Sequence, residues 1–361
     1  MRVLLVEPWF GGSHRQWAEG YARHSEHDVE LLTLPDEGWK WRLRGAALTL
    51  AGQVSTTPDV VLASSMLDVA TFVGHARHHV HRAPVALYMH ENQLTYPLAD
   101  GVSRDTSLAL VNWNSMAAAD SIIFNSAYHR AVWFEALTPL LRSFPPPRHD
   151  GLIDRVRARS HVLPVGVDLD RLRTPLVKQG PPLVLWNQRW EHDKNPTVIA
   201  EILTTLAGTH CDFRVALCGE SPVGEVPPVF DTLVAVLGAR LEHIGFAEQP
   251  QYQQILHDSA IVLSAADHEF FGVAVVEAMA AGAIPVLPDR LAYPEIVGPD
   301  LRSTLYASTD DAVAQVVELL SDASLRSGRS AAASAAAHRF DWESVAPRYD
   351  AMLSEMALRA G

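Results

Sequence analysis

A single carboxylate interrupts a stretch of the chain that otherwise predicts an apolar, buried helix. The stretch follows Glu269 and ends at Gly282, a usual residue at the C-terminus of a helix. Glu277 lies inside it, and a buried carboxylate is costly unless its oxygens accept hydrogen bonds. Ribose hydroxyls are suitable donors, and a neighbouring Arg or Lys is the structural alternative. The backbone N–H groups of Phe271 and Gly272 precede the helix, where they suit a phosphate.

Two cations form a second candidate site. Arg189 and Lys194 lie between an apolar run, which predicts a strand, and a helix for which Asn195 is a good N-cap. Arg binds a diphosphate through paired hydrogen bonds and Lys binds it as a point charge, next to free helix N–H groups. The alternative is a loop in which Glu191 and Asp193 neutralise both cations.

The segment after the first apolar run is a third candidate. Gly11 and Gly12 allow a ligand to approach the backbone closely, and His14 adds an imidazole beside them. Ser13 and Gln16 have the spacing of a capping box, which predicts the start of a helix. The alternative is a tight turn from strand to helix that binds nothing.

Four polar side chains, His90, Glu91, Asn92 and Gln93, come directly after the apolar run Val85–Met89. In a doubly wound sheet, ligands bind at the carboxyl ends of the strands. Imidazole, carboxylate and amides together suit the recognition of hydroxyls and amines, although a single histidine is more often structural.

Short apolar runs that alternate with helical patterns must position these residues. This alternation predicts parallel sheets with crossover helices. The runs are Val3–Val6, Val60–Ala63, Val85–Met89, Ser121–Phe124, Leu183–Trp186, Arg214–Leu217, Ile261–Ser264 and Ile284–Leu287. A Pro/Gly-rich stretch, residues 174–182, separates the two series and is typical of a linker.

The expected fold is therefore α/β, with two doubly wound, Rossmann-like domains that face a central cleft. We expect residues 1–174 to form an N-terminal acceptor-binding domain and residues 175–338 a donor-binding domain. Apolar residues at helical spacing predict a final helix within residues 339–361, with Val345, Tyr349, Met352 and Met356 on one face.

The totals agree with two domains and limit the function. The chain has 361 residues, of which 48% are hydrophobic and 20% charged, as in ordinary globular proteins. The net charge is −13, so a strongly basic nucleic-acid footprint is absent. Residues 1–180 carry 18 Lys+Arg and 18 Asp+Glu, and the remainder carries 11 and 24.

Cysteine content and the N-terminus bear on the compartment. With Cys211 and Cys218 as its only cysteines, the chain has no disulfide framework, which favours a reducing compartment. The apolar run near Met1 is too short for a signal peptide or a membrane span. We expect a cytoplasmic protein without a membrane span.

The spacing of Glu269 and Glu277 resembles the E-x7-E signature of the retaining GT-B glycosyltransferases. Arg189 and Lys194 resemble the diphosphate-binding pair of that family, in spacing and in chain order. The resemblance implies that Glu269 contacts the transferred sugar, that Glu277 contacts the ribose and that the backbone at 271–272 contacts the phosphates. It also implies that the last helix crosses back to the first domain.

Longer strings resemble the queuosine-tRNA mannosyltransferases: "GGSHRQW", "WKWRLR", "HENQLTYP", "NQRWEHDKNP", "HEFFGVAVVEA" and "YPEI". They run from Gly11 to Ile296 and so cover most of the chain. This resemblance implies GDP-mannose as the donor and queuosine at the wobble position of the tRNA-Asp anticodon as the acceptor, with the product anomer retained as alpha.

A −13 chain is an unusual tRNA binder, because phosphate contacts normally supply much of the affinity. Local recognition is therefore expected from the segment Trp39–Arg44, which interleaves aromatic residues with three cations. The alternative is that its tryptophans cap the core.

Roles follow for each candidate residue. We assign His90 and Glu269 to catalysis, where they position and polarise the sugar. Gly11, Gly12, Arg189, Lys194, Phe271, Gly272 and Glu277 are assigned to the donor. His14, Trp41, Arg42, Glu91, Asn92 and Gln93 are assigned to the acceptor.

No cofactor and no obligatory metal are expected, because Arg189, Lys194 and helix N–H groups replace a metal at the leaving diphosphate. We interpret Asp168-Leu169-Asp170, the pattern of metal-dependent transferases, as structural. Three alternatives stay open: a transferase of the same fold with a lipid or small-molecule acceptor, a nucleotide-sugar epimerase, and a non-catalytic sensor of nucleotide sugars.

Overall fold

The computed structural model describes residues 1–98, 101, 103–172, 178, 180–221 and 226–360. It divides the chain into an N-terminal unit, Met1–Val167 with Trp342–Gly361, and a C-terminal unit, Asp168–Asp341. The units therefore meet at residues 167 and 168 rather than at 174 and 175. Most of the expected linker, residues 173–177 and 179, lies outside the described residues.

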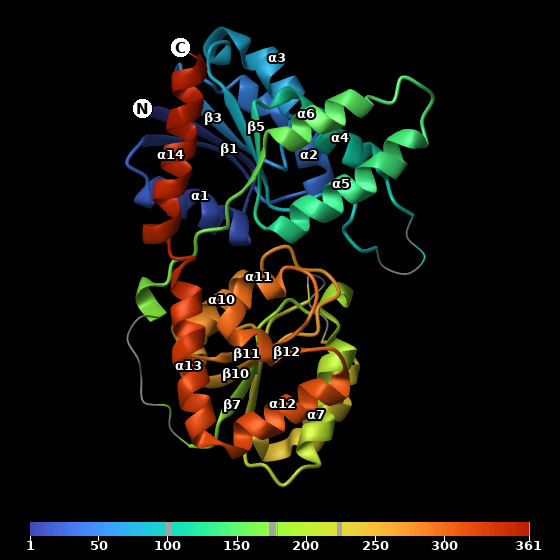
Figure 1. Cartoon of the computed structure of the whole chain (residues 1–361), viewed down its shortest axis with the longest axis vertical. Coiled ribbons are helices and arrows are strands. Elements are labelled where there is room, and N and C mark those ends of the chain that lie inside the picture. Colours follow the sequence, from blue (N-terminus) through green and yellow to red (C-terminus); the bar gives the residue numbers. More distant parts are fainter. Residues whose placement is uncertain (99–100, 102, 173–177, 179, 222–225, 361) are drawn as a thin grey trace. The chain divides into compact units, whose positions relative to one another are not determined.

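The N-terminal unit is built on a six-stranded parallel sheet with the order β2-β1-β3-β4-β5-β6 (Figure 1). Its strands are β1 (Arg2–Phe10), β2 (Asp28–Pro35), β3 (Val60–Ser64), β4 (Val85–Met89), β5 (Ser121–Phe124) and β6 (Ser160–Val162). Its helices are α1 (Gly12–His24), α2 (Trp39–Ala51), α3 (Val69–Val80), α4 (Thr106–Ala118), α5 (Ala127–Arg142), α6 (Asp150–Ala158) and α14 (Trp342–Ala360).

The C-terminal unit repeats this plan with the order β12-β11-β10-β7-β8-β9. Its strands are β7 (Leu183–Trp186), β8 (Arg214–Cys218), β9 (Leu241–Gly245), β10 (Ser259–Leu263), β11 (Ile284–Pro288) and β12 (Leu305–Tyr306). Its α-helices are α7 (Pro196–Ala207), α8 (Val229–Leu237), α9 (Gln249–Asp258), α10 (Val273–Ala280), α11 (Tyr293–Val297), α12 (Thr309–Ser321) and α13 (Ala323–His338). Short 3-10 turns span Asp170–Leu172, His192–Lys194, Gly238–Arg240 and Pro299–Thr304.

All eight apolar runs that predicted strands are confirmed as strands β1, β3, β4, β5, β7, β8, β10 and β11. Most of their residues are buried, because helices cover both faces of a parallel sheet and the strands then read as continuous apolar runs. The strands β2, β6, β9 and β12 were missed. They are the edge strands of the two sheets, and their partly exposed residues break the apolar pattern.

Helix α14 packs on the N-terminal unit. Its first residue, Trp342, is buried, and a Cβ atom added to Gly20 or Gly166 would come within 2.1 or 2.2 Å of the Trp342 ring. Farther along the helix, the Tyr349 hydroxyl donates to the Pro164 carbonyl, and Asp350 accepts from the Tyr21 hydroxyl. The two glycines therefore leave the space in which α14 is anchored.

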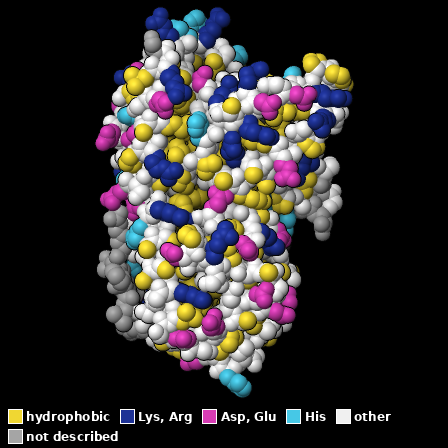
Figure 2. All heavy atoms as spheres, viewed as in Figure 1, with side chains coloured by type: hydrophobic (Ala, Val, Ile, Leu, Met, Phe, Trp, Pro, Cys, Tyr) yellow, Lys and Arg dark blue, Asp and Glu magenta, His cyan; other side chains and the backbone are white. Residues whose placement is uncertain are grey.

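Within the described part of the chain, every helix is too short or too polar to cross a membrane. Lys and Arg side chains lie over α3, α5 and α6 on the face of the N-terminal unit that Figure 2 presents.

Candidate functional site

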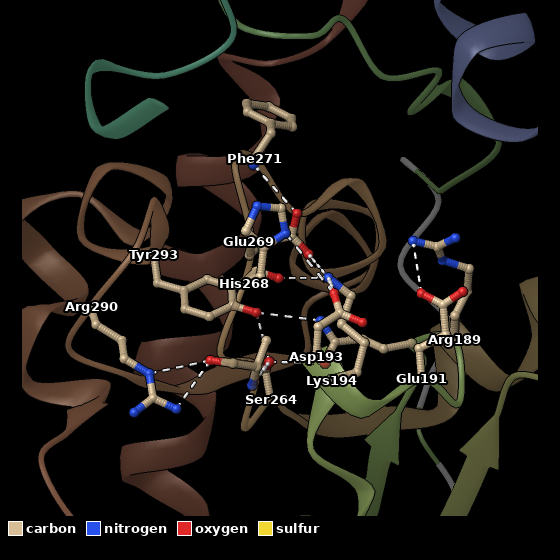
Figure 3. Close-up of polar contacts among 12 residues, drawn as sticks. Arg189, Glu191, Asp193, Lys194, Ser264, His268, Glu269, Phe271, Arg290 and Tyr293 are labelled. Atoms are coloured by element: carbon tan, nitrogen blue, oxygen red, sulfur yellow. Dashed lines mark hydrogen bonds and ion pairs between the residues drawn. The ribbon is translucent and has the colours of Figure 1, made fainter. Parts of the chain in front are cut away.

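Lys194 lies at the centre of a buried ionic cluster in the C-terminal unit (Figure 3). Its Nζ is 3.2 Å from an oxygen of Asp193 and 3.3 Å from one of Glu269, and it donates to the His268 carbonyl at 2.7 Å. Burial alone lowers the pKa of Lys194, but the carboxylates of Glu269 and Asp193 outweigh it, so the pKa is raised. Lys194 is therefore a fixed positive charge next to Glu269.

Glu269 and the turn after it lead into α10. The Phe271 N–H donates to Glu269 Oε1 at 3.4 Å, so the carboxylate holds the backbone turn before the helix. Gly272 is the N-cap residue with φ of 94°, a left-handed conformation in which a side chain is strained. Glycine is thus required for the turn that directs the start of α10 toward Glu269.

The layer beneath this turn was not found from the sequence. The Ser264 hydroxyl is 2.9 Å from Gln188 Oε1 and 2.6 Å from the Tyr293 hydroxyl. A Cβ atom on Gly272 would lie 3.6 Å from the Tyr293 ring. The signal was present, because Gln188 and Tyr293 stand within the strings "NQRWEHDKNP" and "YPEI", but their spacing in the chain does not indicate that they meet.

Arg189 is placed differently from Lys194. Its side chain is 61% exposed, and its Nη2 lies 3.4 Å from an oxygen of Glu191. Burial raises the pKa of Glu191, and the charge of Arg189 opposes this rise. The neutralised loop that the sequence offered as an alternative is therefore formed in part, although the guanidinium stays accessible to an anion.

The predicted helix boundary at Asn195 is confirmed, but the Asn195 side chain does not cap the helix. Helix α7 begins at Pro196, and Asn195 precedes it with φ of 55°, without a side-chain cap. Its amide donates instead to Asp267 at 3.1 Å. Asparagine is suitable here because it tolerates the left-handed conformation.

Both oxygens of Glu277 have partners inside the C-terminal unit. Arg171 donates to Oε1 at 3.0 Å, and the Tyr252 hydroxyl donates to Oε2 at 3.1 Å. Asn187 in turn donates to the Tyr252 hydroxyl at 2.9 Å. Burial raises the pKa of Glu277, and Arg171 and Tyr252 offset only part of the rise. The cationic neighbour considered from the sequence is thus present, and it is Arg171.

The Asp-x-Asp pattern lies at the start of the same unit. Asp170 opens a 3-10 turn and is exposed, whereas Asp168 is half-buried. The charge of Asp168 contributes to the raised pKa of Glu277. Neither aspartate belongs to the group of His, Asp, Glu and Cys residues, among those described, whose ligand atoms lie close enough to share a metal ion.

In the N-terminal unit, His14 and His90 meet at a buried carboxylate that the sequence did not single out. Glu7 is fully buried within β1, and its Oε2 lies 2.9 Å from His14 Nδ1 and 3.9 Å from His90 Nε2. The two imidazole rings are 4.2 Å apart, and Trp17 packs edge-on against His90 at 4.6 Å. Burial, followed by the charges of His14 and His129, holds the pKa of His90 well below its usual value.

The polar side chains after His90 divide into two kinds. Asn92 is fully buried, and its Oδ1 accepts from the backbone N–H groups of Leu94 and Thr95, so it shapes the loop. Gln93 donates from its amide to Glu91 at 3.2 Å, and both of these side chains are partly exposed. Glu91 and Gln93 are therefore the members of this group that present polar atoms.

The predicted capping box at Ser13 and Gln16 is wrong. Helix α1 begins at Gly12, with Gly11 as a cap that has no side chain, so Ser13 already lies inside the first turn. A Cβ atom on Gly11 would come within 1.8 Å of Asp36, whereas Gly12 has open space and a positive φ of 49°. The space beside Gly11 is therefore filled by the Asp36 side chain, and the backbone at Gly12 is the more open of the two.

Trp41 lies on the surface of the N-terminal unit, on α2. Its side chain is 69% exposed, which rules out the alternative that it caps the core. The ring covers Gly45, where a Cβ atom would come within 2.8 Å of it. Arg42 donates to the Pro35 carbonyl at 3.0 Å, and Arg44 pairs with Asp105 at 2.6 Å.

Comparisons with known proteins match both halves of this arrangement. Residues 2–167 match the family described as tRNA-queuosine alpha-mannosyltransferase N-terminal, and residues 170–336 match Glycosyl transferases group 1. The chain is 34% identical over 307 residues to the tRNA-queuosine alpha-mannosyltransferase of Drosophila melanogaster, covering 81% of each chain. It is 27% identical over 247 residues to the GDP-mannose:cellobiosyl-diphosphopolyprenol alpha-mannosyltransferase of Xanthomonas campestris, covering 63% of each.

A solved structure supports the fold. Anabaena HepE in complex with UDP superposes with a TM-score of 0.70 at 16% identity, covering 98% of this chain and 100% of that chain. The two parallel sheets with flanking helices are those of a GT-B glycosyltransferase, with two Rossmann-like domains. The chain is a glycosyltransferase, and by its identity to the Drosophila protein over most of its length it belongs to the tRNA-queuosine alpha-mannosyltransferase family.

Proposed function

We propose that the chain transfers mannose from GDP-mannose to queuosine at the wobble position of the tRNA-Asp anticodon, with retention of the anomer and without a metal ion. The observation that carries the proposal is the group formed by Lys194, Glu269 and the start of α10. It combines a fixed cation, a carboxylate and a glycine turn at a helix N-terminus. The names of the two mannosyltransferase relatives support mannose as the sugar.

The leaving diphosphate is bound by charge. Lys194 supplies a positive charge that its surroundings hold in place, and Arg189 supplies an accessible guanidinium. The turn at Phe271 and Gly272 supplies N–H groups, and the Phe271 N–H is shared with Glu269. These groups stabilise the charge that develops as the bond to the sugar breaks, which is the work that a metal ion performs in other transferases. Chelators should therefore not lower the rate of transfer.

Glu277 and Glu269 bind the ribose and the mannose of the donor. Glu277 is a buried acceptor at which the ribose hydroxyls share or replace the bond from Arg171. Glu269, held between Lys194 and the Phe271 N–H, accepts from the hydroxyls of mannose. His90 positions and polarises the sugar, since its lowered pKa keeps the imidazole neutral.

The acceptor is recognised by the N-terminal unit. Trp41 offers a stacking surface, and Arg42 lies next to it in the chain. His14, Glu91 and Gln93 carry the hydrogen-bonding atoms suited to a modified base that bears hydroxyls and an amine. A tRNA substrate fits a cytoplasmic location.

One experiment tests the assignment. The purified chain is incubated with GDP-mannose and with tRNA that contains queuosine, and the digested nucleosides are analysed by mass spectrometry. A hexose increment on queuosine is expected, and none on matched tRNA with guanosine at the wobble position. His90→Gln should lower the rate by roughly 100-fold, in the range for a group that assists transfer of charge or protons.

The same assay separates the alternatives. The name of the Xanthomonas relative includes a diphosphopolyprenol acceptor, so a lipid-linked cellobiose is the appropriate rival substrate. Transfer to that acceptor without a hexose on tRNA would refute the specific assignment. An altered sugar without any acceptor would indicate an epimerase, and donor binding without transfer or hydrolysis would indicate a sensor.

Retention and metal independence need their own measurements. The anomeric configuration of the product is read by NMR or by digestion with an α-mannosidase, and an α-linkage is expected. Activity after exhaustive chelation should be no lower than that before chelation. Loss of activity that Mg²⁺ or Mn²⁺ restores would contradict the role given to Arg189 and Lys194.

A further inference from the structure

Glu7, His14 and His90 form a compact group of metal-ligand atoms in the N-terminal unit. One nitrogen or oxygen from each residue lies within 4.8 Å of the other two, and this is the group of that kind found among the described residues. Glu7 lies within β1, His14 in the first turn of α1, and His90 directly after β4. The fold thus assembles two imidazoles and a carboxylate from three separate segments.

The geometry fits a tetrahedral zinc ion. Bonds of about 2.0–2.1 Å to nitrogen and oxygen place neighbouring tetrahedral ligands roughly 3.3 Å apart. The distances from Glu7 Oε2 to His14 Nδ1 and to His90 Nε2 are 2.9 and 3.9 Å, which bracket this value. The shorter contact is a hydrogen bond, whose proton a cation would replace. Two histidines and a glutamate also leave the fourth position open, as in catalytic zinc sites.

One unsatisfied polar atom indicates that the group accepts a further partner. The His90 side chain is 8% exposed, and its buried Nε2 has no hydrogen-bond partner among the described residues. Glu7 is fully buried, and its second oxygen is already held by the Trp9 N–H at 2.9 Å. That bond fixes the orientation of the carboxylate, as hydrogen bonds to the ligands do in metal sites.

We propose that Glu7, His14 and His90 bind one Zn²⁺ ion, and that this ion inhibits the enzyme. Zinc binding rests on the geometry of the group alone. Inhibition rests on the proposed function, because a His90 nitrogen that ligates zinc is withdrawn from the sugar. Zinc would thus be a regulator of the reaction rather than a requirement for it.

A second set of histidines competes for zinc and has to be removed first. His75, His78 and His79 share a face of α3 at helical spacing, and His81 follows directly. These side chains are exposed or half-buried, and they lie outside the sites proposed above. A background variant in which all four are changed to Gln removes surface binding, and its production should avoid a polyhistidine tag.

The binding test uses the full chain of this background variant with Zn²⁺ and a competing chromophoric chelator. One zinc ion per chain is expected. Glu7→Gln and His14→Gln should each weaken binding by more than about 100-fold, because the loss of a ligand costs more than the roughly 10- to 100-fold seen for residues that only orient ligands. Co²⁺ should give the visible absorption of a tetrahedral site, and His161→Gln, an exposed control, should change neither result.

The outcomes are distinct. Absence of binding, or binding that survives both Glu7→Gln and His14→Gln, overturns the site. If Glu7→Gln does not fold, His14→Gln alone decides, since His14 is at the edge of the group and 9% exposed.

The inhibition test compares mannose transfer with and without zinc in each variant. Zinc should inhibit the background variant, and the ratio of the two rates should return toward one in His14→Gln, whatever its own activity. Zinc that binds without inhibiting overturns the regulatory part. Absence of transfer by the zinc-free enzyme refutes the proposed function instead, and leaves the stoichiometry and the Co²⁺ spectrum as independent measures of the site.

Discussion

Arg171 donates to Glu277 at 3.0 Å inside the C-terminal unit, so the carboxylate proposed for the ribose already has a cationic partner. Arg171 is also tied to Gln249 at 2.7 Å, and its carbonyl accepts from Gln253. A ribose that binds Glu277 must share this oxygen or displace the guanidinium. The ion pair therefore gives a way to separate a ligand-binding carboxylate from a purely structural one.

Glu277→Ala should weaken GDP-mannose binding by about 10- to 100-fold, the effect of losing hydrogen bonds to a charged group. Arg171→Ala should leave donor affinity within about threefold, because it frees Oε1 for a hydroxyl while Tyr252 still holds Oε2. Both affinities are measured by calorimetry. Equal losses in the two variants would show that the pair is structural and that Glu277 does not bind the ribose.

Substitutions of Arg189 and of Lys194 should have different effects on stability as well as on activity. Lys194→Met leaves Asp193 and Glu269 facing each other without a cation, which costs about 3–5 kcal/mol of the free energy of unfolding. Arg189→Ala should change stability by less than about 1 kcal/mol, because the side chain is 61% exposed, yet reduce turnover by roughly 100-fold. Denaturant unfolding and transfer rates check both; normal turnover of Arg189→Ala would exclude it from the diphosphate site.

Trp41→Ala should weaken binding of queuosine tRNA by roughly 1–3 kcal/mol, the contribution of one stacked base. Fold and donor affinity should not change, because the side chain is 69% exposed. Leu48→Ala, another exposed apolar position on α2, is the matched control. Filter binding measures the effect, and a loss of the same size in the Leu48 variant would argue against a specific contact.

Gly166→Ala should destabilise the N-terminal unit by about 1–3 kcal/mol, because the new methyl group would lie 2.2 Å from the buried Trp342 ring. Gly74→Ala is the control: its Cβ meets nothing within 4 Å on exposed α3, so it should stabilise by about 0.5–1 kcal/mol. Thermal unfolding compares the two. Equal melting temperatures would mean that α14 is not anchored at this ring.

Acid should destabilise the C-terminal unit through His268. Burial, and next the charge of Lys194, lower its pKa from 6.5 to about 4. In that window the unfolded chain binds a proton that the folded chain does not, so the free energy of unfolding falls as the pH falls. Between pH 6.5 and about pH 5 the loss from this residue is about 1.6 kcal/mol. The test is the free energy of unfolding of the wild type and of His268→Gln, measured at both pH values. A loss of stability of the same size in both proteins would contradict the prediction.

Much of the fold follows from local pattern. The inner strands are apolar along their whole length because both faces of a parallel sheet are covered, and this makes them legible in the sequence. Glu277 can be recognised in the sequence for the same reason, because it is a charge where only apolar residues are expected. The outer strands β2 and β9 are not, since partial exposure leaves them with mixed sequences.

The sequence does not predict which side chains contact one another. It identified His14, His90 and Glu277 but left open what each one meets. Glu7 lies within β1, where no local pattern marks it, and Arg171 is far from Glu277 along the chain. Strand order and helix packing bring Glu7 to His90 and Arg171 to Glu277, and these long-range arrangements are set by burial of the whole core rather than by the residues around each site.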